Sequence, residues 1–399
     1  MNKVYNTVWC ASRGMWVVTS ELVRKGGQRP RQIRRTVLAG LIAGLLAPQA
    51  PVLAMSYDNE VLVGNGSSLT LNSGDTATNT SINSLGVLYI SSGGSATSSV
   101  VEQFGKEDIY DGGVATDTTV NSLGRQNISS GGSALGTVVN SSGGQYVFSG
   151  GSAVSAVLNR WGEQNVIGGI ATDTIISGGT QKVSSGGHAL DTVINSGYQQ
   201  VFSGGSATNT IINSGAQSIE AGGNASGTII NTQYIGLYVS SGGNVTNVTI
   251  NKGSMNVSAG AGATSTTVNK GASQAVMGGN ATDTILDGGH QGIYAGGYGS
   301  STIVNSGLQV INRAGSASDT TINSGGIQRV SSGGNATNTS VNSGGQQEVL
   351  SGGSVASTII NDGGVQYVLA EGRASGTVIN AGGVQHILNW QNPGYPTGS

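Results

Sequence analysis

One phrase of 18 to 20 residues recurs 17 times between Gly74 and Asn389. Read from its glycine pair, the phrase is roughly G-G-x-A-T-x-T-x-I-N-S-G-G-x-Q-x-V-x-S, and residues 204–219 are a typical copy. A fixed period of this length indicates a stacked architecture in which each repeat contacts only its neighbours. Such a stack offers a long side wall rather than a single cleft, so the period constrains function as well as fold.

Each repeat contains two short runs of alternating character, separated by glycine-rich turns, and alternation is typical of β-strands. The first run ends in Ile, Val or Leu in all 17 repeats, and threonine stands two residues earlier in 14 of them. The second run carries glutamine in 13 of 17 repeats, two residues before an Ile or Val. Side chains two apart share a face of a strand, so both pairs are expected inside. Two strands and two turns then make one coil.

The predicted fold class is all-β, a right-handed parallel β-helix (β-solenoid) of about 17 coils of 18–20 residues. A β-propeller is the alternative, but propeller repeats are about twice as long. Asparagine follows the first-run aliphatic residue in 14 of 17 repeats. Stacked asparagines are expected to form a hydrogen-bonded ladder along the axis, or to serve only as turn residues that tolerate a left-handed backbone.

The segment before the repeats has the features of a secretory leader. Six basic residues between Arg24 and Arg35 precede an apolar run of 11 residues at 37–47, and Val52-Leu53-Ala54 supplies small residues for a signal peptidase. The apolar run is shorter than the roughly 20 residues of a membrane span. We predict four parts: an extended signal peptide at 1–54, cleaved after Ala54; an N-terminal cap or lead-in at 55–73; the repeat β-helix at 74–389; and a tail at 390–399 with no translocator barrel.

Composition and motifs argue against most kinds of chemistry. Only 9% of residues are charged and the net charge is -2, so no basic stripe for nucleic acid is expected. The one cysteine, Cys10, lies in the leader. The histidines, His188, His290 and His386, fall at different places in the phrase, so neither a metal nor another cofactor is expected.

An acidic column is the nearest approach to a catalytic constellation. Five aspartates share one outward position of the first run, which solubility explains because Asn, Ser and Gly fill it elsewhere: Asp117, Asp173, Asp191, Asp283 and Asp319. No repeat is long enough to carry an active-site loop, so the chain is not expected to be an enzyme.

The outward residue before the first-run aliphatic is Val or Ile in 11 of 17 repeats. Six consecutive coils would align these residues as one stripe: Val138, Val157, Ile175, Val193, Ile211 and Ile229. A contiguous apolar surface usually marks a contact site, so the stripe is a candidate for self-association. Strand propensity alone is the alternative reason for β-branched residues there.

Two parts of the chain resemble known secreted proteins. The leader is similar to the extended signal peptide of type V secretion in its matching residues: Asn2, Lys3, Tyr5, Trp9, Val18, Ser20 and Glu21. The repeats resemble AIDA-type autotransporter adhesins, in particular the self-associating, glycosylatable members, over residues 1 to about 389. The resemblance implies a passenger displayed at the cell surface or outer membrane, provided that a barrel is supplied, and a periplasmic protein otherwise.

The same resemblance implies function and partners. The passenger would mediate autoaggregation, biofilm formation and adherence, with copies of itself and the host cell surface as partners. In some members a heptosyltransferase modifies repeat serines, which here suggests as acceptors Ser92, Ser130, Ser149, Ser185, Ser203, Ser241, Ser332 and Ser351. The alternatives are a truncated, non-functional remnant of such an adhesin and a secreted β-helical enzyme.

Overall fold

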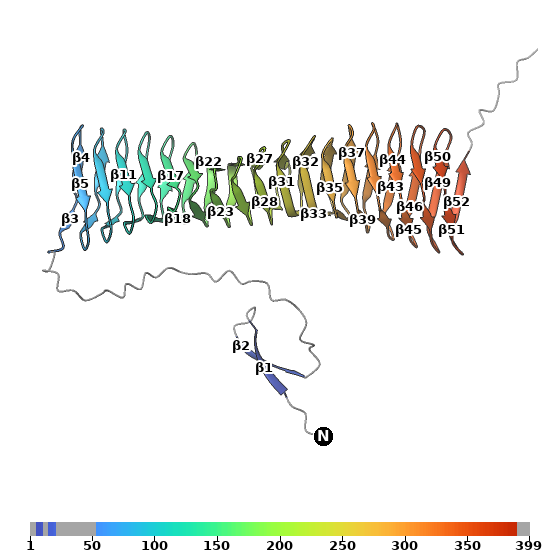
Figure 1. Ribbon diagram of the computed structural model, residues 1–399, viewed down its shortest axis with the longest axis horizontal. Coiled ribbons are helices and arrows are strands. Elements are labelled where there is room, and N and C mark those ends of the chain that lie inside the picture. The colour runs from blue at the N-terminus through green and yellow to red at the C-terminus, as the bar shows by residue number, and fades with distance from the viewer. Residues whose placement is uncertain (1–4, 11–14, 21–52, 389–399) are drawn as a thin grey trace, which may run out of the picture. The chain divides into compact units, whose positions relative to one another are not determined.

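The computed structural model describes residues 5–10, 15–20 and 53–388. The chain divides into two units, Met1–Pro51 and Val52–Ser399. In the first unit, β1 (Tyr5–Cys10) and β2 (Met15–Ser20) pair antiparallel. The second unit holds the other 50 strands in one sheet (Figure 1). The described residues include no helix that is long and apolar enough to cross a membrane. The leader's apolar run at 37–47 lies outside the described residues.

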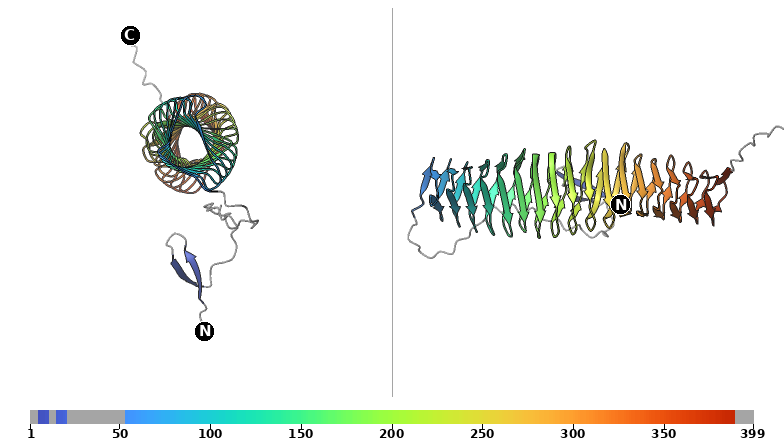
Figure 2. Two further views of the ribbon diagram at one scale, coloured as in Figure 1. Left: turned by 90° about the vertical axis from the view of Figure 1, so that its left-hand side faces the viewer. Right: turned by 90° about the horizontal axis from the view of Figure 1, so that it is seen from above.

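The second unit is a parallel β-solenoid of about 18 coils. Each strand pairs in parallel with the equivalent strand of the next coil, so the coils superpose when viewed along the stack (Figure 2). The segment 55–73, expected to be a cap or lead-in, forms a complete coil that pairs with the next one through all three of its strands. This coil accounts for the difference from the predicted 17. The right-handed sense stays a prediction.

Each coil contains three short strands where the sequence predicted two. The first strand follows the glycine pair, and in sixteen coils it is a separate strand: β3 (Ser56–Asp58), β6 (Thr76–Thr78), β9 (Ser95–Thr97), β12 (Val114–Thr116), β15 (Ser133–Leu135), β18 (Ser152–Val154), β21 (Ile170–Thr172), β23 (His188–Leu190), β25 (Ser206–Thr208), β28 (Asn224–Ser226), β35 (Asn280–Thr282), β38 (Tyr298–Ser300), β41 (Ser316–Ser318), β44 (Asn335–Thr337), β47 (Ser354–Ala356) and β50 (Arg373–Ser375).

The second strand contains the buried aliphatic residue. Where it is separate, it is β4 (Val61–Val63), β7 (Ser81–Asn83), β10 (Val100–Val101), β13 (Thr119–Val120), β16 (Val138–Val139), β19 (Val157–Asn159), β26 (Ile211–Ile212), β29 (Ile229–Ile230), β36 (Ile285–Asp287), β39 (Ile303–Val304), β42 (Thr321–Ile322), β45 (Ser340–Val341), β48 (Ile359–Ile360) and β51 (Val378–Ile379). In β31 (Asn244–Ile250) and β33 (Gly262–Asn269) the first and second strands are continuous.

The third strand carries the glutamine. It is β5 (Ser68–Leu71), β8 (Val87–Ile90), β11 (Lys106–Ile109), β14 (Arg125–Ile128), β17 (Gly144–Phe148), β20 (Glu163–Ile167), β27 (Ala216–Ile219), β30 (Ile235–Val239), β32 (Gly253–Ser258), β34 (Ala272–Met277), β37 (His290–Tyr294), β40 (Leu308–Ile311), β43 (Ile327–Val330), β46 (Gln346–Val349), β49 (Val365–Leu369) and β52 (Val384–Leu388). In β22 (Ile175–Ser184) and β24 (Val193–Val201) it is continuous with the second strand.

A left-handed corner divides the predicted first run into two strands. The residue before the buried threonine has a positive φ in every coil, for example +56° at Asn209 and +54° at Asp283. Asn, Asp, Ser and Gly fill this position because they tolerate that backbone best. The assignment of the five aspartates to solubility was therefore incomplete. Their column also includes Ser98, Gly136 and Ser155, and backbone conformation selects all of its members.

The glycine pair between the third and first strands has two separate causes. Gly150 has a φ of +77°, which favours glycine. A Cβ added to Gly151 would lie 2.5 Å from the carbonyl oxygen of Ile128 in the coil beneath. The first glycine is therefore required by the turn, whereas the second is required by the close approach of adjacent coils.

The interior confirms the predicted facing of the repeat. Ile212, Thr210 and Gln217 are fully buried, and so are their equivalents in most coils. Ala207 is buried as well, three residues before Thr210, because the corner at Asn209 shifts the alternation of the strand by one residue. The core therefore contains two aliphatic columns, an alanine column, a threonine column and a glutamine column.

The buried glutamines form a hydrogen-bonded ladder along the axis. Gln199 Nε2 donates to Gln181 Oε1 at 2.6 Å, and Gln199 Oε1 accepts from Gln217 Nε2 at 2.6 Å and from Thr210 Oγ1 at 3.0 Å. A buried amide is tolerated only when its polar atoms are paired, and the stack provides that pairing through the next copy of itself. One ladder includes residues 126–217 and another includes residues 274–385.

The predicted asparagine ladder is also present, on the outside of the stack. Asn213 Nδ2 donates to Asn195 Oδ1 at 3.0 Å, and Asn231 Nδ2 donates to Asn213 Oδ1 at 3.2 Å. Other runs connect the coils between Asn121 and Asn159 and between Asn305 and Asn380. These residues serve both as a ladder and as the residues that lead into the turn.

The first glutamine ladder begins on a glutamate. Glu107 Oε2 accepts from Gln126 Nε2 at 2.7 Å and from Thr118 Oγ1 at 2.9 Å. Glu107 is fully buried, and burial raises the pKa of its carboxyl above the ordinary value of 4.5, against the opposing effect of these two hydrogen bonds. The second ladder begins on Gln274, whose Nε2 has no partner because Met255 lies beneath it.

The glutamine ladder is expected to stabilise the stack measurably. Replacing Gln199 with Met keeps the volume but removes one hydrogen bond from each of Gln181, Gln217 and Thr210. Thermal or denaturant unfolding should show a loss of roughly 1–3 kcal/mol. Gln200→Met, on the outward side of the same strand, is the matched control and should change stability little. Equal stability of the two variants would contradict a structural role for the ladder.

Glu107 is expected to make stability depend on pH. Because its pKa is raised on folding, its favourable contribution is complete below about pH 4.5 and is lost as pH rises through the folded pKa. Glu107→Gln should therefore gain stability relative to the wild type as pH rises from 4.5 to 8. Asp108→Asn, outward on the same strand, controls for the change in net charge. A stability difference that does not vary with pH would contradict the prediction.

Candidate interaction surfaces

The structure places the six predicted stripe residues on one column of second strands. Val138 pairs with Val157, and Val157 with Ile175. The column continues through Val193, Ile211 and Ile229 in direct register. Ile175 is 39% exposed and the other five are half-buried, so the stripe is a shallow apolar surface rather than a row of projecting side chains.

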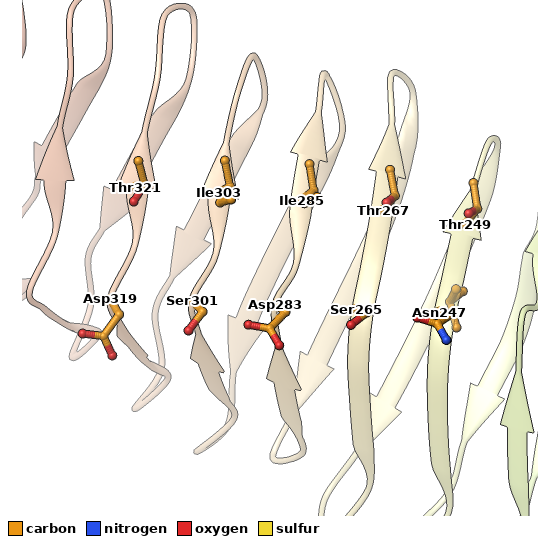
Figure 3. Close-up of a pocket in the computed structure, with 11 residues that line it drawn as sticks. Asn247, Thr249, Ser265, Thr267, Asp283, Ile285, Ser301, Ile303, Asp319 and Thr321 are labelled. Atoms are coloured by element: carbon orange, nitrogen blue, oxygen red, sulfur yellow. The ribbon is translucent and has the colours of Figure 1, made fainter. Parts of the chain in front are cut away.

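The same column continues towards the C-terminal end with a mixture of Thr and Ile. Thr249, Thr267, Ile285, Ile303 and Thr321 follow Ile229 in register. Together with the corner residues they line a groove of about 580 Å³ (Figure 3). In Figure 3 the corner side chains stand in one row and the strand side chains in a parallel row. Sequence reasoning missed this groove because it did not predict the corner.

The corner gives the groove a charged edge. Asp283 and Asp319 lie two coils apart in this row, with Ser301 between them. In most coils the backbone N–H of the corner residue donates to the next coil, as from Asp283 to Ser300 O at 3.1 Å. Asp319 also accepts from Asn338 Nδ2 at 3.2 Å. The five aspartates stand in a column of Asn, Ser and Gly, so over residues 59–376 the corner edge is acidic or neutral.

The eight candidate acceptor serines all lie exposed at one turn. Each directly precedes the first glycine of a pair, between the third and first strands. Successive turns are connected by backbone hydrogen bonds, such as Gly93 N–H to Gly112 O at 3.0 Å. The serines therefore stand along one edge of the stack, where an enzyme has access to the hydroxyls. Their modification stays a prediction.

The predicted cleavage site lies at the start of the first coil. Ala54 is exposed, and the backbone N–H of the next residue, Met55, donates to Asp75 Oδ1 at 2.8 Å. Backbone hydrogen bonds from Met55 and Asn72 hold the pKa of the Asp75 carboxyl below its ordinary range. Asp75 occupies a second-glycine position, and its side chain is buried there.

The histidines do not come together. His188 is exposed on β23, and the ring of His386 on β52 stacks on Tyr367 with 5.1 Å between centroids. His290 is half-buried on β37, and burial lowers the pKa of its imidazole. Within residues 53–388 no group of three or more His, Cys, Asp or Glu side chains is arranged to hold a metal ion.

Two protein families match parts of the chain. The family described as the extended signal peptide of the type V secretion system matches residues 1–50. The family described as an adhesin of the bacterial autotransporter system, probable stalk, matches residues 55–105 and 332–383. These matches confirm the extended signal peptide and the resemblance of the repeats. They place the protein among those exported across the inner membrane to the cell surface or outer membrane.

Two curated relatives match about a quarter of the chain each. Autotransporter CRAC of Citrobacter rodentium (strain ICC168) is 73% identical over 89 residues, which are 22% of this chain and 6% of that protein. The autotransporter adhesin/invasin TibA of Escherichia coli O78:H11 (strain H10407 / ETEC) is 66% identical over 93 residues, which are 23% of this chain and 9% of that protein. The matched segments thus span less than a tenth of either relative.

One solved structure is also similar in sequence. It is the TibC-catalysed, hyper-glycosylated fragment 55–350 of TibA, 37% identical, covering 84% of this chain and 97% of the fragment, with a TM-score of 0.34. The assignment of a solenoid to this chain depends on its own strand pairing and not on that superposition.

Proposed function

Because the chain belongs to the AIDA-type autotransporter adhesin passengers, we propose that it mediates self-association between cells and adhesion to host cells. The observation that carries the proposal is the apolar column on the second strands, continuous in register from Val138 to Ile229. A long, regular, weakly charged column suits side-by-side contact between two rods. Repetition of a weak contact over many coils raises the combined affinity without any single strong site.

We infer that the passenger acts by binding rather than by catalysis. The coils keep a length of 18–20 residues with no inserted loop to carry an active site. The partners are a second copy of the chain and the host cell surface. A non-functional remnant is the alternative, and it predicts that cells displaying the chain neither clump nor adhere.

O-glycosylation of the serine edge is the second part of the proposal. The resemblance implies heptose as the sugar and a heptosyltransferase as the partner. The exposed column of eight serines supports the proposal, and so does the similarity to TibA, of which a fragment hyper-glycosylated by TibC has been solved. The serines lie at the turn before the first strand, and the stripe lies on the second strand, after the left-handed corner. Sugars attached to the serines would therefore leave the stripe uncovered.

Replacing the stripe with polar β-branched residues is expected to abolish clumping. Ile175, Val193, Ile211 and Ile229 are changed to Thr, which the same column already uses at Thr249 and Thr267, so strand propensity is retained. Cells displaying this variant should settle as single cells, while the purified chain unfolds at the wild-type temperature. The same four positions are also changed to Ser, which is polar but lacks the β-strand propensity of Thr. If clumping is lost with Ser but kept with Thr, strand propensity and not apolar contact is what matters, and the stripe is not a contact surface.

Most of the sugar attached to the exported chain is expected to be on the eight serines of the serine edge. Intact mass of the exported chain, produced with an autotransporter heptosyltransferase, should exceed the peptide mass by whole heptose increments. Replacing the eight serines with Ala should remove most of the increments. The matched control replaces serines of the opposite turn: Ser122, Ser141, Ser196, Ser214, Ser324 and Ser343. An unmodified wild-type mass, or equal loss in both variants, would contradict the assignment of this edge.

A further inference from the structure

Large apolar residues occupy left-handed turn positions near the N-terminal end of the stack. Leu85, Phe104, Leu123 and Trp161 stand between the second and third strands, with φ values of 73°, 69°, 62° and 65°. Bulky side chains rarely adopt this conformation, and later coils place glycine here, as at Gly197 and Gly215. The four side chains are also about half exposed or more, and Trp161 is 63% exposed. Backbone strain combined with exposed apolar area indicates a function rather than a packing role.

One coil in this column carries a small residue instead. The backbone N–H of Leu123 donates to Ser142 O, and the N–H of Ser142 donates to Trp161 O, each at 3.0 Å, so Ser142 lies directly between the two apolar side chains. In the adjacent column, Gly144 lies between Arg125 and Glu163. The ring of Tyr146 covers Gly144, 2.9 Å from where a Cβ would lie, so the recess of this coil relative to the coils on either side is at Ser142. The result is a hollow of about 690 Å³ with this coil as its floor.

The dimensions of the hollow suit one flat ring. Leu123 and Trp161 are two coils apart, which is about 9.6 Å at about 4.8 Å per coil. A ring between them would contact each side at about the 3.5–4.0 Å that carbon atoms prefer, with some room to spare. The Trp161 indole supplies a face for stacking, and Arg160 lies 5.2 Å from its ring centroid.

The polar lining contains both donors and acceptors, and its two charged residues, Arg125 and Glu163, have opposite signs. Arg125 lies over the ring of Tyr146, 4.1 Å from the centroid, and Glu163 forms an ion pair with Lys182 at 3.0 Å. The hydroxyls of Ser141 and Ser142 line the floor. This arrangement suits a neutral ligand with many hydroxyl groups and an apolar ring face better than it suits an anion, a cation or an alkyl chain.

We propose that this hollow binds a terminal pyranose of a neutral host-cell glycan, with the sugar ring between Trp161 and Leu123 over the recessed coil. The proposal rests on the proposed adhesive function and assigns it a ligand class. The carbon-bound hydrogens of the sugar stack on the indole, and its hydroxyl groups exchange hydrogen bonds with Ser141, Ser142, Arg125 and Glu163. The site lies at a different turn from the serine edge, so attached sugars do not cover it.

The test measures binding of the purified, exported full chain to a panel of immobilised neutral oligosaccharides that end in hexoses or N-acetylhexosamines. Trp161→Ala should weaken binding about tenfold or more. Ser142→Leu should do the same by filling the hollow, and it is compatible with the fold because Leu123 holds the same turn position one coil earlier. Leu85→Ala, in the same column but outside the lining, is the matched control and should bind like the wild type.

A fluorescence titration provides a readout at the site itself. In a Trp390→Phe background, Trp161 is the one tryptophan left after removal of the leader, so a soluble sugar from the panel should shift its emission. Equal binding by wild type and Trp161→Ala would overturn the inference. So would the absence of binding to any saccharide while displayed chains still attach to host cells, an outcome that leaves the adhesive function standing. Binding through Trp161 without cell attachment would support the inference and count against the adhesive function.

Discussion

In-register stacking of parallel coils is the constraint on which the rest of this structure depends. Each coil donates and accepts its backbone hydrogen bonds with the coils on either side, so every residue lies over its equivalent in the next repeat. The burial, backbone conformation and hydrogen-bond partners of a position are therefore nearly the same in every coil, and so is the residue type that fits them. A glutamine inside such a stack is stable because its amide both donates and accepts along the axis, which a single buried glutamine in an ordinary core rarely achieves.

The polar ladder couples residues that are distant in the phrase. Thr228 donates to Gln217, eleven residues earlier, and one coil further on both partners are apolar together as Val248 and Leu237. When Thr and Gln are both replaced by apolar residues, no polar atom is left unpaired. Where Met255 alone replaces the glutamine, Thr266 Oγ1 and Gln274 Nε2 have no partners. The direction of the ladder also explains Glu107. The first member is needed only as an acceptor, and a carboxyl oxygen of Glu107 provides one at the cost of a buried acid.

Much of the fold could be predicted because the repeat length and the alternation of inward and outward residues can both be read directly from the sequence. The buried Ile212, Thr210 and Gln217 and the asparagine ladder were predicted from spacing alone. The three-strand coil was not predicted. Inferring which side chains face inward from their alternation assumes a continuous extended strand, and the left-handed corner at Asn209 interrupts that strand. Residue type carried the missing signal: a column restricted to Asn, Asp, Ser and Gly indicates positive φ. The groove of Figure 3 was missed for the same reason.

Repetition and departure from repetition support different kinds of recognition. The stripe from Val138 to Ile229 is the same feature repeated, so its contacts gain strength from number and tolerate sliding by whole coils. The hollow beside Trp161 exists because one coil carries the small Ser142 where its neighbours carry Leu123 and Trp161, and it has one location on the rod. Identical coils produce a wall, and only a coil unlike its neighbours produces a recess. In a solenoid that needs the same residue type at every level for stability, a strained Trp161 in place of glycine is therefore more informative about function than any residue that follows the repeat.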